Sequence, residues 1–417
     1  MRFTPSIVES CRRQFPALSR RVGDYPAAFL DGPGGTQVPQ RVIDAISHYL
    51  AHTNANHGGL FATSRESDAL LDQTHAAFAD FLGADDPQTI VFGQNMTSLT
   101  FALSRSLART WKPGDEIVVT RLDHDANVSP WTLAARDAGA TVRWVPLRPD
   151  DGTLDLAALR ELLSPRTRLV AVGCASNAVG TVNPVRDIVD WAHQAGALVY
   201  LDAVHYAPHA LIDVQALGCD FLACSAYKFF GPHLGILWGR RQLLDELEAY
   251  KVRPAPVAPP DKWMTGTQNH EAIAGALAAV DYLADLGRTL AGNKSLSRRT
   301  ALREAYHDIG TYERSLASRL LSGLAEIPEI KLWGITQPER IDQRVATISF
   351  THQRFTAAQM AERLAQQGFF TWQGNYYALN FTEAMGLEPD GMLRVGLLHY
   401  NTMAEVERLL DAVRGLR

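Results

Sequence analysis

Short runs of β-branched and other apolar residues alternate with segments of helical periodicity between about residues 60 and 240. The runs lie at 89–92, 116–119, 141–145, 169–172, 198–201 and 235–238. Between them, 155–163 and 185–195 repeat apolar residues at the spacing of an amphipathic helix. Strands that alternate with helices pair in parallel and are covered on both faces. This part of the chain therefore predicts an α/β fold with a largely parallel sheet.

The pattern changes after a proline-rich segment at 251–262. Because proline fixes φ and lacks an N–H donor, this segment predicts an irregular, stiff loop. Helical spacing follows at 271–286 and 311–324, then a strand at 345–350 and a last helix at 403–413. These elements predict a second, α+β domain.

Bulk composition narrows the classes of partner. A chain of 417 residues with 46% apolar residues can form two domains with a substantial core. The net charge of -5 is mild and interspersed, which argues against a nucleic-acid or membrane-binding face and favours a small-molecule partner. The four cysteines show no paired spacing, so we expect neither a metal site nor disulfides. No signal-like segment is present, and we expect a cytoplasmic enzyme.

The segment 225–232, SAYKFFGP, places Lys228 among aromatic residues, 26 residues after Asp202, which closes an apolar strand. This arrangement suits an amine that holds pyridoxal phosphate (PLP) as a Schiff base, with the aspartate facing the pyridine nitrogen. The carboxylate would keep that nitrogen protonated, and desolvation would keep the lysine a free amine. The alternative is a surface lysine after a turn and an aspartate that caps a helix.

A candidate phosphate site follows the strand at 89–92. There, Asn95, Met96 and Thr97 open a helix, and phosphate binds well at a helix start, where unpaired N–H groups and the helix dipole coincide. The same residues would also build an ordinary capped helix.

Together these segments resemble the class V aminotransferases, a group of fold-type-I PLP enzymes, and within them the cysteine-desulfurase-like branch. The motifs that carry the resemblance lie at 29–35, 95–97, 123–127, 176–181, Asp202, 225–232, 266–267, Arg394 and 399–402. The resemblance implies a large PLP-binding domain at 31–290 with a mostly parallel seven-stranded sheet. It also implies a small C-terminal domain at 291–417, on which residues 1–30 pack. A homodimer is implied as well, in which Thr267 reaches the cofactor of the neighbouring subunit.

The resemblance also assigns roles to single residues. Ser225 and His205 would be further phosphate donors, and His124 would stack on the cofactor ring and move protons with a near-neutral pKa. Asn177 would lie near the cofactor's phenolic oxygen and the substrate carboxylate, and Arg394 would clamp that carboxylate. The alternatives are a solvated loop histidine for His124 and an interdomain salt bridge for Arg394.

The chain departs from the desulfurase pattern in the segment 371–378. No cysteine follows Cys224, and Tyr377 stands where those enzymes carry the sulfur acceptor. Trp372 replaces a second arginine of many relatives, and Tyr227 replaces the histidine before the lysine. The aromatic side chains of Trp372, Tyr376 and Tyr377 would line a larger, flatter substrate pocket or only pack between domains.

We therefore expect Lys228, His124 and Asp202 to be the catalytic residues of a PLP enzyme that acts on an amino acid. Without a sulfur acceptor, β-elimination from a substituted cysteine, a C–S lyase reaction, is the leading expectation. Transamination and Cα epimerisation are the enzymatic alternatives. A catalytically silent PLP-binding protein is the alternative from another class.

Overall fold

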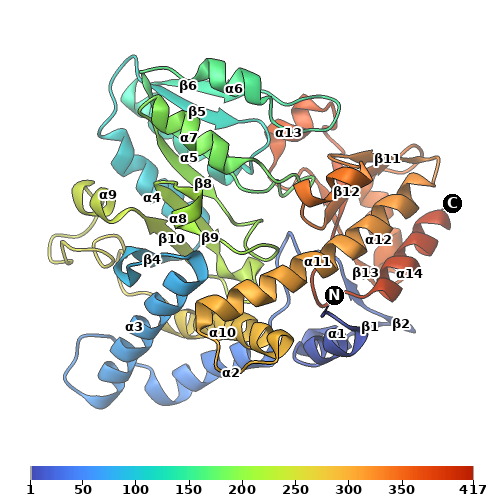
Figure 1. Ribbon diagram of the computed structural model, residues 1–417, viewed down its shortest axis with the longest axis horizontal. Coiled ribbons are helices and arrows are strands. Elements are labelled where there is room, and N and C mark those ends of the chain that lie inside the picture. The colour runs from blue at the N-terminus through green and yellow to red at the C-terminus, as the bar shows by residue number, and fades with distance from the viewer. Residues whose placement is uncertain (1, 417) are drawn as a thin grey trace.

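The central feature of the structure, a computed structural model that describes residues 2–416, is a seven-stranded sheet (Figure 1). Its strand order is β4-β10-β9-β8-β7-β5-β6. The strands are β4 (Ile90–Gly93), β5 (Glu116–Thr120), β6 (Thr141–Val145), β7 (Thr167–Gly173), β8 (Leu198–Asp202), β9 (Phe221–Ser225) and β10 (Gly235–Gly239). Only β10 runs antiparallel to its neighbours, so the predicted mostly parallel sheet is confirmed.

The sequence pattern did not predict one strand of this sheet, β9. All five residues of β9, Phe221–Ser225, are buried, although the strand lacks the β-branched residues that mark the others. β9 lies between β8 and β10, and it leads directly into Lys228. Tertiary packing rather than local propensity therefore decides this element.

Helices cover both faces of the sheet, and two hydrophobic cores result (Figure 1). Successive residues of β5 show the division, since Ile117 and Val119 belong to one core while Val118 belongs to the other. Because side chains of a strand alternate between faces, a sheet buried on both faces needs this continuous apolar run. The helices of this part are α2 (Gln40–His48), α3 (Ala62–Leu82), α4 (Met96–Ala108), α5 (Ser129–Ala138), α6 (Leu156–Leu162), α7 (Val185–Gln194), α8 (Val214–Leu217) and α9 (Arg241–Glu246).

Two long helices, α10 (His270–Ala291) and α11 (Arg298–Ala325), connect this part to a smaller sheet. That sheet is antiparallel with order β11-β12-β15-β14, formed by β11 (Ile330–Trp333), β12 (Thr347–His352), β14 (Trp372–Gly374) and β15 (Met392–Gly396). Helices α12 (Ala357–Ala365), α13 (Leu379–Ala384) and α14 (Met403–Arg414) complete it. The predicted helix at 311–324 is thus only the second half of α11, which begins after the cap Ser297. The segment 251–262 contains no helix or strand, as predicted.

The N-terminal segment lies beside the C-terminal elements (Figure 1). It contains α1 (Pro5–Arg12), the hairpin β1 (Arg21–Val22) and β2 (Tyr25–Pro26), and β3 (Ala28–Phe29). Strand β3 pairs in parallel with β13 (Phe369–Phe370), and Arg12 forms an ion pair of 3.0 Å with Glu405. These contacts hold residues far apart in sequence together, while the exact domain boundaries stay a prediction.

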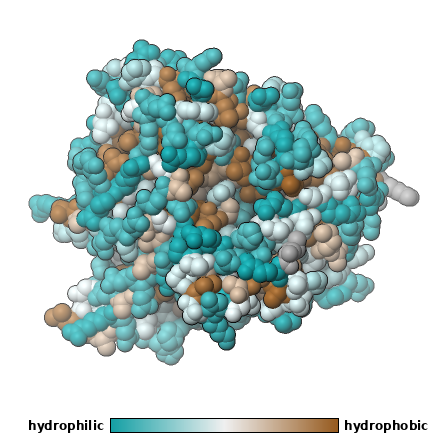
Figure 2. Space-filling model, viewed as in Figure 1, coloured by the Kyte–Doolittle hydropathy of each residue, from teal (hydrophilic) through white to brown (hydrophobic). Residues whose placement is uncertain are grey.

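The surface is mixed in character: Figure 2 shows hydrophilic residues over most of the visible face, with hydrophobic residues scattered between them. Within residues 2–416, no helix combines the length and the apolarity that crossing a bilayer requires. The same residues contain no cluster of three or more metal-ligating side chains.

Helices α10 and α11 pack closely against each other at Gly287. A Cβ atom there would lie 1.8 Å from the carbonyl oxygen of Ala301. We expect Gly287→Ala to force the helices apart and to lower the free energy of unfolding by about 2 kcal/mol, measured by chemical denaturation. Gly310→Ala is the matched control, because a Cβ there would meet the flexible end of Arg314 at 3.2 Å and the His209 backbone oxygen at an ordinary contact distance of 3.7 Å, and alanine favours the helix. Equal destabilisation by both changes would contradict this account.

Candidate active site

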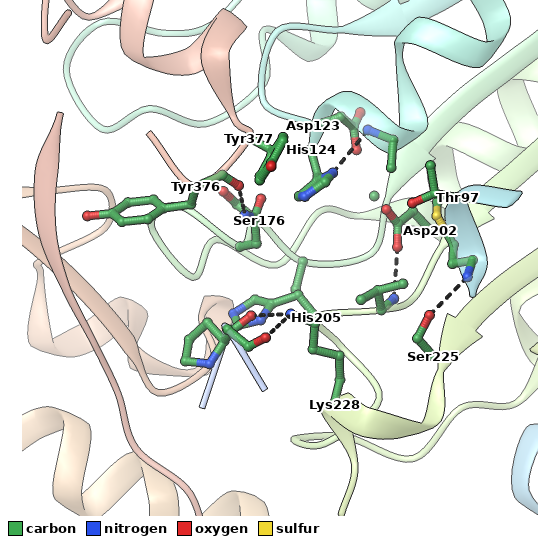
Figure 3. Close-up of a pocket in the computed structure, with 18 of the residues that line it drawn as sticks. Thr97, Asp123, His124, Ser176, Asp202, His205, Ser225, Lys228, Tyr376 and Tyr377 are labelled. Atoms are coloured by element: carbon green, nitrogen blue, oxygen red, sulfur yellow. Dashed lines mark hydrogen bonds between the residues drawn. The ribbon is translucent and has the colours of Figure 1, made fainter. Parts of the chain in front are cut away.

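A cavity of about 600 Å³ lies where the carboxyl ends of β5, β7 and β8 meet the start of α4 (Figure 3). In parallel sheets, ligands bind at this edge, because the loops that follow the strands converge there. Most of the predicted site residues line the cavity: Asn95, Met96, Thr97, His124, Asn177, Asp202, His205, Ser225, Lys228, Trp372, Tyr377 and Arg394. The structure therefore brings the predicted residues together at one cavity, with Thr267 as the exception, while their roles stay predictions.

Lys228 ends a short 3-10 helix, Ala226–Lys228, directly after β9. Its Nζ donates hydrogen bonds to the backbone oxygens of Pro33 and Gly34, at 2.5 and 2.9 Å. Burial lowers the pKa of Lys228 to about 7, and the positive charge of Arg394 adds to this effect, while Asp202 opposes it. Near neutral pH a large share of the side chain is therefore the free amine that a nucleophile requires.

Asp202 closes β8 and is 7% exposed. Its Oδ1 accepts a hydrogen bond of 2.8 Å from the Val204 N–H. Burial raises the pKa of Asp202 to about 6, and that hydrogen bond and the charge of Lys228 oppose the shift. A second buried carboxyl, that of Asp123, lies nearby, with a pKa raised to about 7 by burial and by the charge of Asp202.

His124 caps a 3-10 turn after β5. Its Nδ1 accepts a 3.0 Å hydrogen bond from the Ala126 N–H, so the hydrogen of the neutral ring lies on Nε2. Burial lowers the pKa of His124 to about 4, and Lys228 and Arg394 contribute. The expected near-neutral pKa is therefore wrong, and the ring is neutral at neutral pH, with its hydrogen on Nε2. Its ring stacks on Tyr377 at 5.4 Å between centroids (Figure 3).

The start of α4 forms a compact polar corner. Asn95 is the N-cap residue, and its side chain accepts from the Ser98 N–H at 2.9 Å, while the Met96 N–H donates to Ser225 Oγ at 3.0 Å. Gly235 makes the close approach possible, because a Cβ there would lie 2.4 Å from the Asn95 backbone. Helix capping and phosphate binding are compatible here, since the cap leaves the dipole of α4 directed at the cavity.

Of two further predicted phosphate ligands, His205 lines the cavity and Thr267 does not. His205 Nε2 shares a 3.0 Å hydrogen bond with the Thr347 hydroxyl of β12, whereas Ser225 bonds the start of α4. Thr267 is exposed and does not line the cavity of its own chain. The roles of both residues stay predictions.

Arg394, on β15, is 3% exposed. One terminal nitrogen, Nη1, donates to the Asn177 backbone oxygen at 2.8 Å, while Nε is buried without a partner. Within residues 2–416 no carboxylate forms an ion pair with Arg394, so the alternative of an interdomain salt bridge is wrong. Burial lowers the pKa of Arg394 to about 10, and the group stays charged at neutral pH. The side chain thus presents an unused edge that a carboxylate would fit.

Asn177, in the loop after β7, lies beside this arginine. Its Nδ2 donates to the Tyr376 backbone oxygen at 2.9 Å, and its Oδ1 is buried without a partner. Two neighbouring residues therefore carry unsatisfied buried polar atoms at the same side of the cavity, which is typical of a ligand site.

Aromatic side chains form much of the remaining wall. Trp372 is 49% exposed and Tyr377 is 72% exposed, and both line the cavity. Tyr227 stacks on His233 at 4.9 Å, and Lys228 Nζ lies 4.7 Å from the centroid of the Tyr227 ring. The residue before the lysine thus contacts the amine through a π-face instead of an imidazole nitrogen.

The sequence pattern assigns no role to Asp123, which belongs to the motif at 123–127 and lies three residues after the end of β5. Tyr376 was expected only as a wall of the substrate pocket, yet its ring lies 4.1 Å from the guanidinium carbon of Arg394. No local sequence signal predicts that contact.

None of the four cysteines can serve this cavity as a nucleophile. Cys11, Cys174, Cys219 and Cys224 are each no more than 1% exposed, and burial raises the pKa of every one of these thiols. Because the thiolate is the nucleophilic form, buried thiols of raised pKa are unreactive.

A desolvated lysine after the sheet, an aspartate at the end of the neighbouring strand and a free arginine from the small sheet define a fold-type-I PLP-dependent transferase. Residues 28–409 match the family described as "Aminotransferase class-V", and the chain belongs to that family. This family depends on PLP.

Several relatives match along nearly their whole length. The chain is 32% identical to a cysteine desulfurase of Serratia proteamaculans, with 98% of each chain covered. It is also 32% identical to the "Aminotransferase-like protein FGM3" of Gibberella zeae, with 97% of each covered. Among solved structures, the cysteine desulfurase CsdA of Escherichia coli superposes with a TM-score of 0.83 at 27% identity and 97% coverage of both chains.

The depressed pKa of Lys228 can be measured directly. In protein freed of cofactor and labelled with [13Cε]lysine, we expect one lysine resonance to titrate near pH 7, identified by its loss in Lys228→Arg. Arg394→Gln removes a neighbouring positive charge and should raise this pKa, whereas Asp202→Asn removes a negative charge and should lower it. Titration of Lys228 near its ordinary pKa of about 10.4 would contradict the buried site.

Proposed function

We propose that this protein is a PLP-dependent C–S lyase that eliminates the sulfur substituent from an S-substituted cysteine. One observation supports this proposal most directly. The cavity contains Lys228, Asp202 and Arg394, but Tyr377 occupies the position of the sulfur acceptor. All four cysteines are buried, so no thiol of this chain is available to accept the sulfur as a persulfide. The sulfur is therefore released with its substituent.

The residues present fit PLP. Lys228 supplies the amine for its aldehyde, Asp202 supplies a buried carboxylate for its ring nitrogen, and the start of α4 with Ser225 supplies donors for its phosphate. When bound, the cofactor supplies an electron sink that lets the Cα–H bond of an amino acid break.

Arg394 binds the substrate carboxylate through its unused edge. A guanidinium with one terminal nitrogen already fixed on the Asn177 oxygen is oriented before the substrate arrives, which reduces the entropy lost on binding. Asn177 Oδ1 lies beside it as an unpaired acceptor.

Lys228 removes the Cα proton, because its amine is substantially unprotonated near neutral pH. His124 is neutral with its hydrogen on Nε2, so it donates a hydrogen bond and does not act as the base. The Cβ–S bond then breaks, and sulfur leaves with the bonding electrons as a thiolate. The remaining aminoacrylate hydrolyses to pyruvate and ammonia.

Transamination is the second candidate, because one relative is named aminotransferase-like. Cα epimerisation requires the same first proton transfer, so the assay below tests all three. The candidate from another class, a PLP-binding protein without activity, is disfavoured. Such a protein would need no buried arginine with unpaired N–H groups beside the cofactor.

The assembly and location are part of the proposal. A homodimer would bring Thr267, exposed on the loop before α10, to the phosphate of the neighbouring subunit. We also propose that the enzyme works in the cytoplasm on a small amino acid, without nucleic-acid or membrane partners.

A product assay tests the reaction. The holoenzyme with S-methylcysteine should give pyruvate and methanethiol in equal amounts and no pyridoxamine, and Lys228→Ala should lower the rate at least ~100-fold. With free cysteine under reducing conditions we expect no alanine, which a persulfide-forming desulfurase would release. Pyridoxamine without pyruvate would establish transamination instead, and Cα hydrogen exchange alone would establish epimerisation.

A further inference from the structure

Two consecutive tyrosines adopt a backbone conformation that side-chain-bearing residues avoid. Tyr376 and Tyr377 have φ angles of 58° and 60°, in the left-handed region. Such residues persist only where the surroundings over-determine them, and they cluster at functional sites. The pair occupies the loop between β14 and α13, beside the cavity.

The first tyrosine of this turn contacts both residues with unpaired polar atoms. The Tyr376 ring lies 4.1 Å from the guanidinium carbon of Arg394, and the Tyr376 backbone oxygen accepts from Asn177 Nδ2 at 2.9 Å. Its hydroxyl donates to the Met392 backbone oxygen, two residues before Arg394 on β15. Tyr376 is 6% exposed, so these contacts are shielded from water.

The second tyrosine links the turn to the opposite wall. The Tyr377 backbone oxygen accepts from the Asp125 N–H at 2.7 Å, and the Tyr377 ring stacks on His124 (Figure 3). The left-handed backbone therefore lets adjacent residues contact loops that follow two different strands of the large sheet, β5 and β7.

We propose that Tyr376 is the positioning residue of the substrate-carboxylate site, acting through Arg394 and Asn177. This inference rests on the proposed function, because it assumes that Arg394 binds a carboxylate. A ring packed on the face of a guanidinium leaves the in-plane N–H groups free, and those groups bind a carboxylate. A buried arginine without an anion also gains from the π-face, because burial alone disfavours its charge.

The test compares two ligands that differ only in the carboxylate. S-methyl-α-methylcysteine has no Cα hydrogen to remove, and 2-methyl-1-(methylthio)propan-2-amine, which carries a methyl group in place of the carboxylate, has none either. Calorimetric titration of the holoenzyme gives Kd for each. We expect Tyr376→Leu to raise Kd for the amino acid about 10-fold, and to change Kd for the amine less than about twofold. Tyr376→Phe keeps the ring and should stay within about threefold of the native protein for both ligands.

Phe369→Leu is the matched control, because it removes a ring that lies 4.6 Å from another guanidinium, that of Arg408, outside the cavity. It should leave both Kd values unchanged. A Tyr376→Leu variant that weakens both ligands alike would show a merely structural role and overturn the inference.

Arg394→Gln separates this inference from the proposed function. If it weakens only the amino acid while Tyr376→Leu changes neither ligand, the carboxylate assignment stands and the role of Tyr376 is refuted. If Arg394→Gln affects both ligands equally or neither, the carboxylate assignment itself fails, and the inference fails with it.

Discussion

The burial of two cations in one cavity is the constraint on which the rest of the site depends. Removing Lys228 and Arg394 from water disfavours both charges, and the charge of Arg394 further disfavours that of Lys228. The consequence differs between the lysine and the arginine. Lys228 loses its proton readily and becomes a nucleophile, whereas Arg394 stays charged and is held by a backbone oxygen and an aromatic face.

The carboxyls around these cations follow from the same constraint. Asp202 and Asp31 both favour the charged form of Lys228, and Asp31 also favours that of Arg394, but burial raises the pKa of each carboxyl to about 6. At neutral pH Asp202 and Asp31 are mostly ionised, so they offset part of the positive charge of Lys228 and Arg394.

The sequence predicted those parts of the structure that depend on local pattern. Strands rich in β-branched residues and the motif pair of Asp202 and Lys228 were found, because a strand end fixes where a side chain points. β9 was missed because it lacks the β-branched residues that mark the other strands. The near-neutral pKa expected of His124 was wrong because burial of the ring, invisible in sequence, dominates it.

The Tyr376–Tyr377 turn shows most clearly what sequence reasoning lacks. The sequence predicted that its two aromatic residues line the pocket. It did not predict their left-handed backbone, because neither position is a glycine, the residue that usually marks this conformation. The turn exists because hydrogen bonds from Asn177 and Asp125, on separate loops, fix both of its carbonyl oxygens. Tyr377, at the position of the sulfur acceptor, supplies no thiol, whereas the backbone of the preceding Tyr376 bonds Asn177 beside Arg394. Loss of the acceptor and the proposed binding of an amino acid are therefore physically compatible, and that compatibility favours the proposed lyase over a protein that has lost its function.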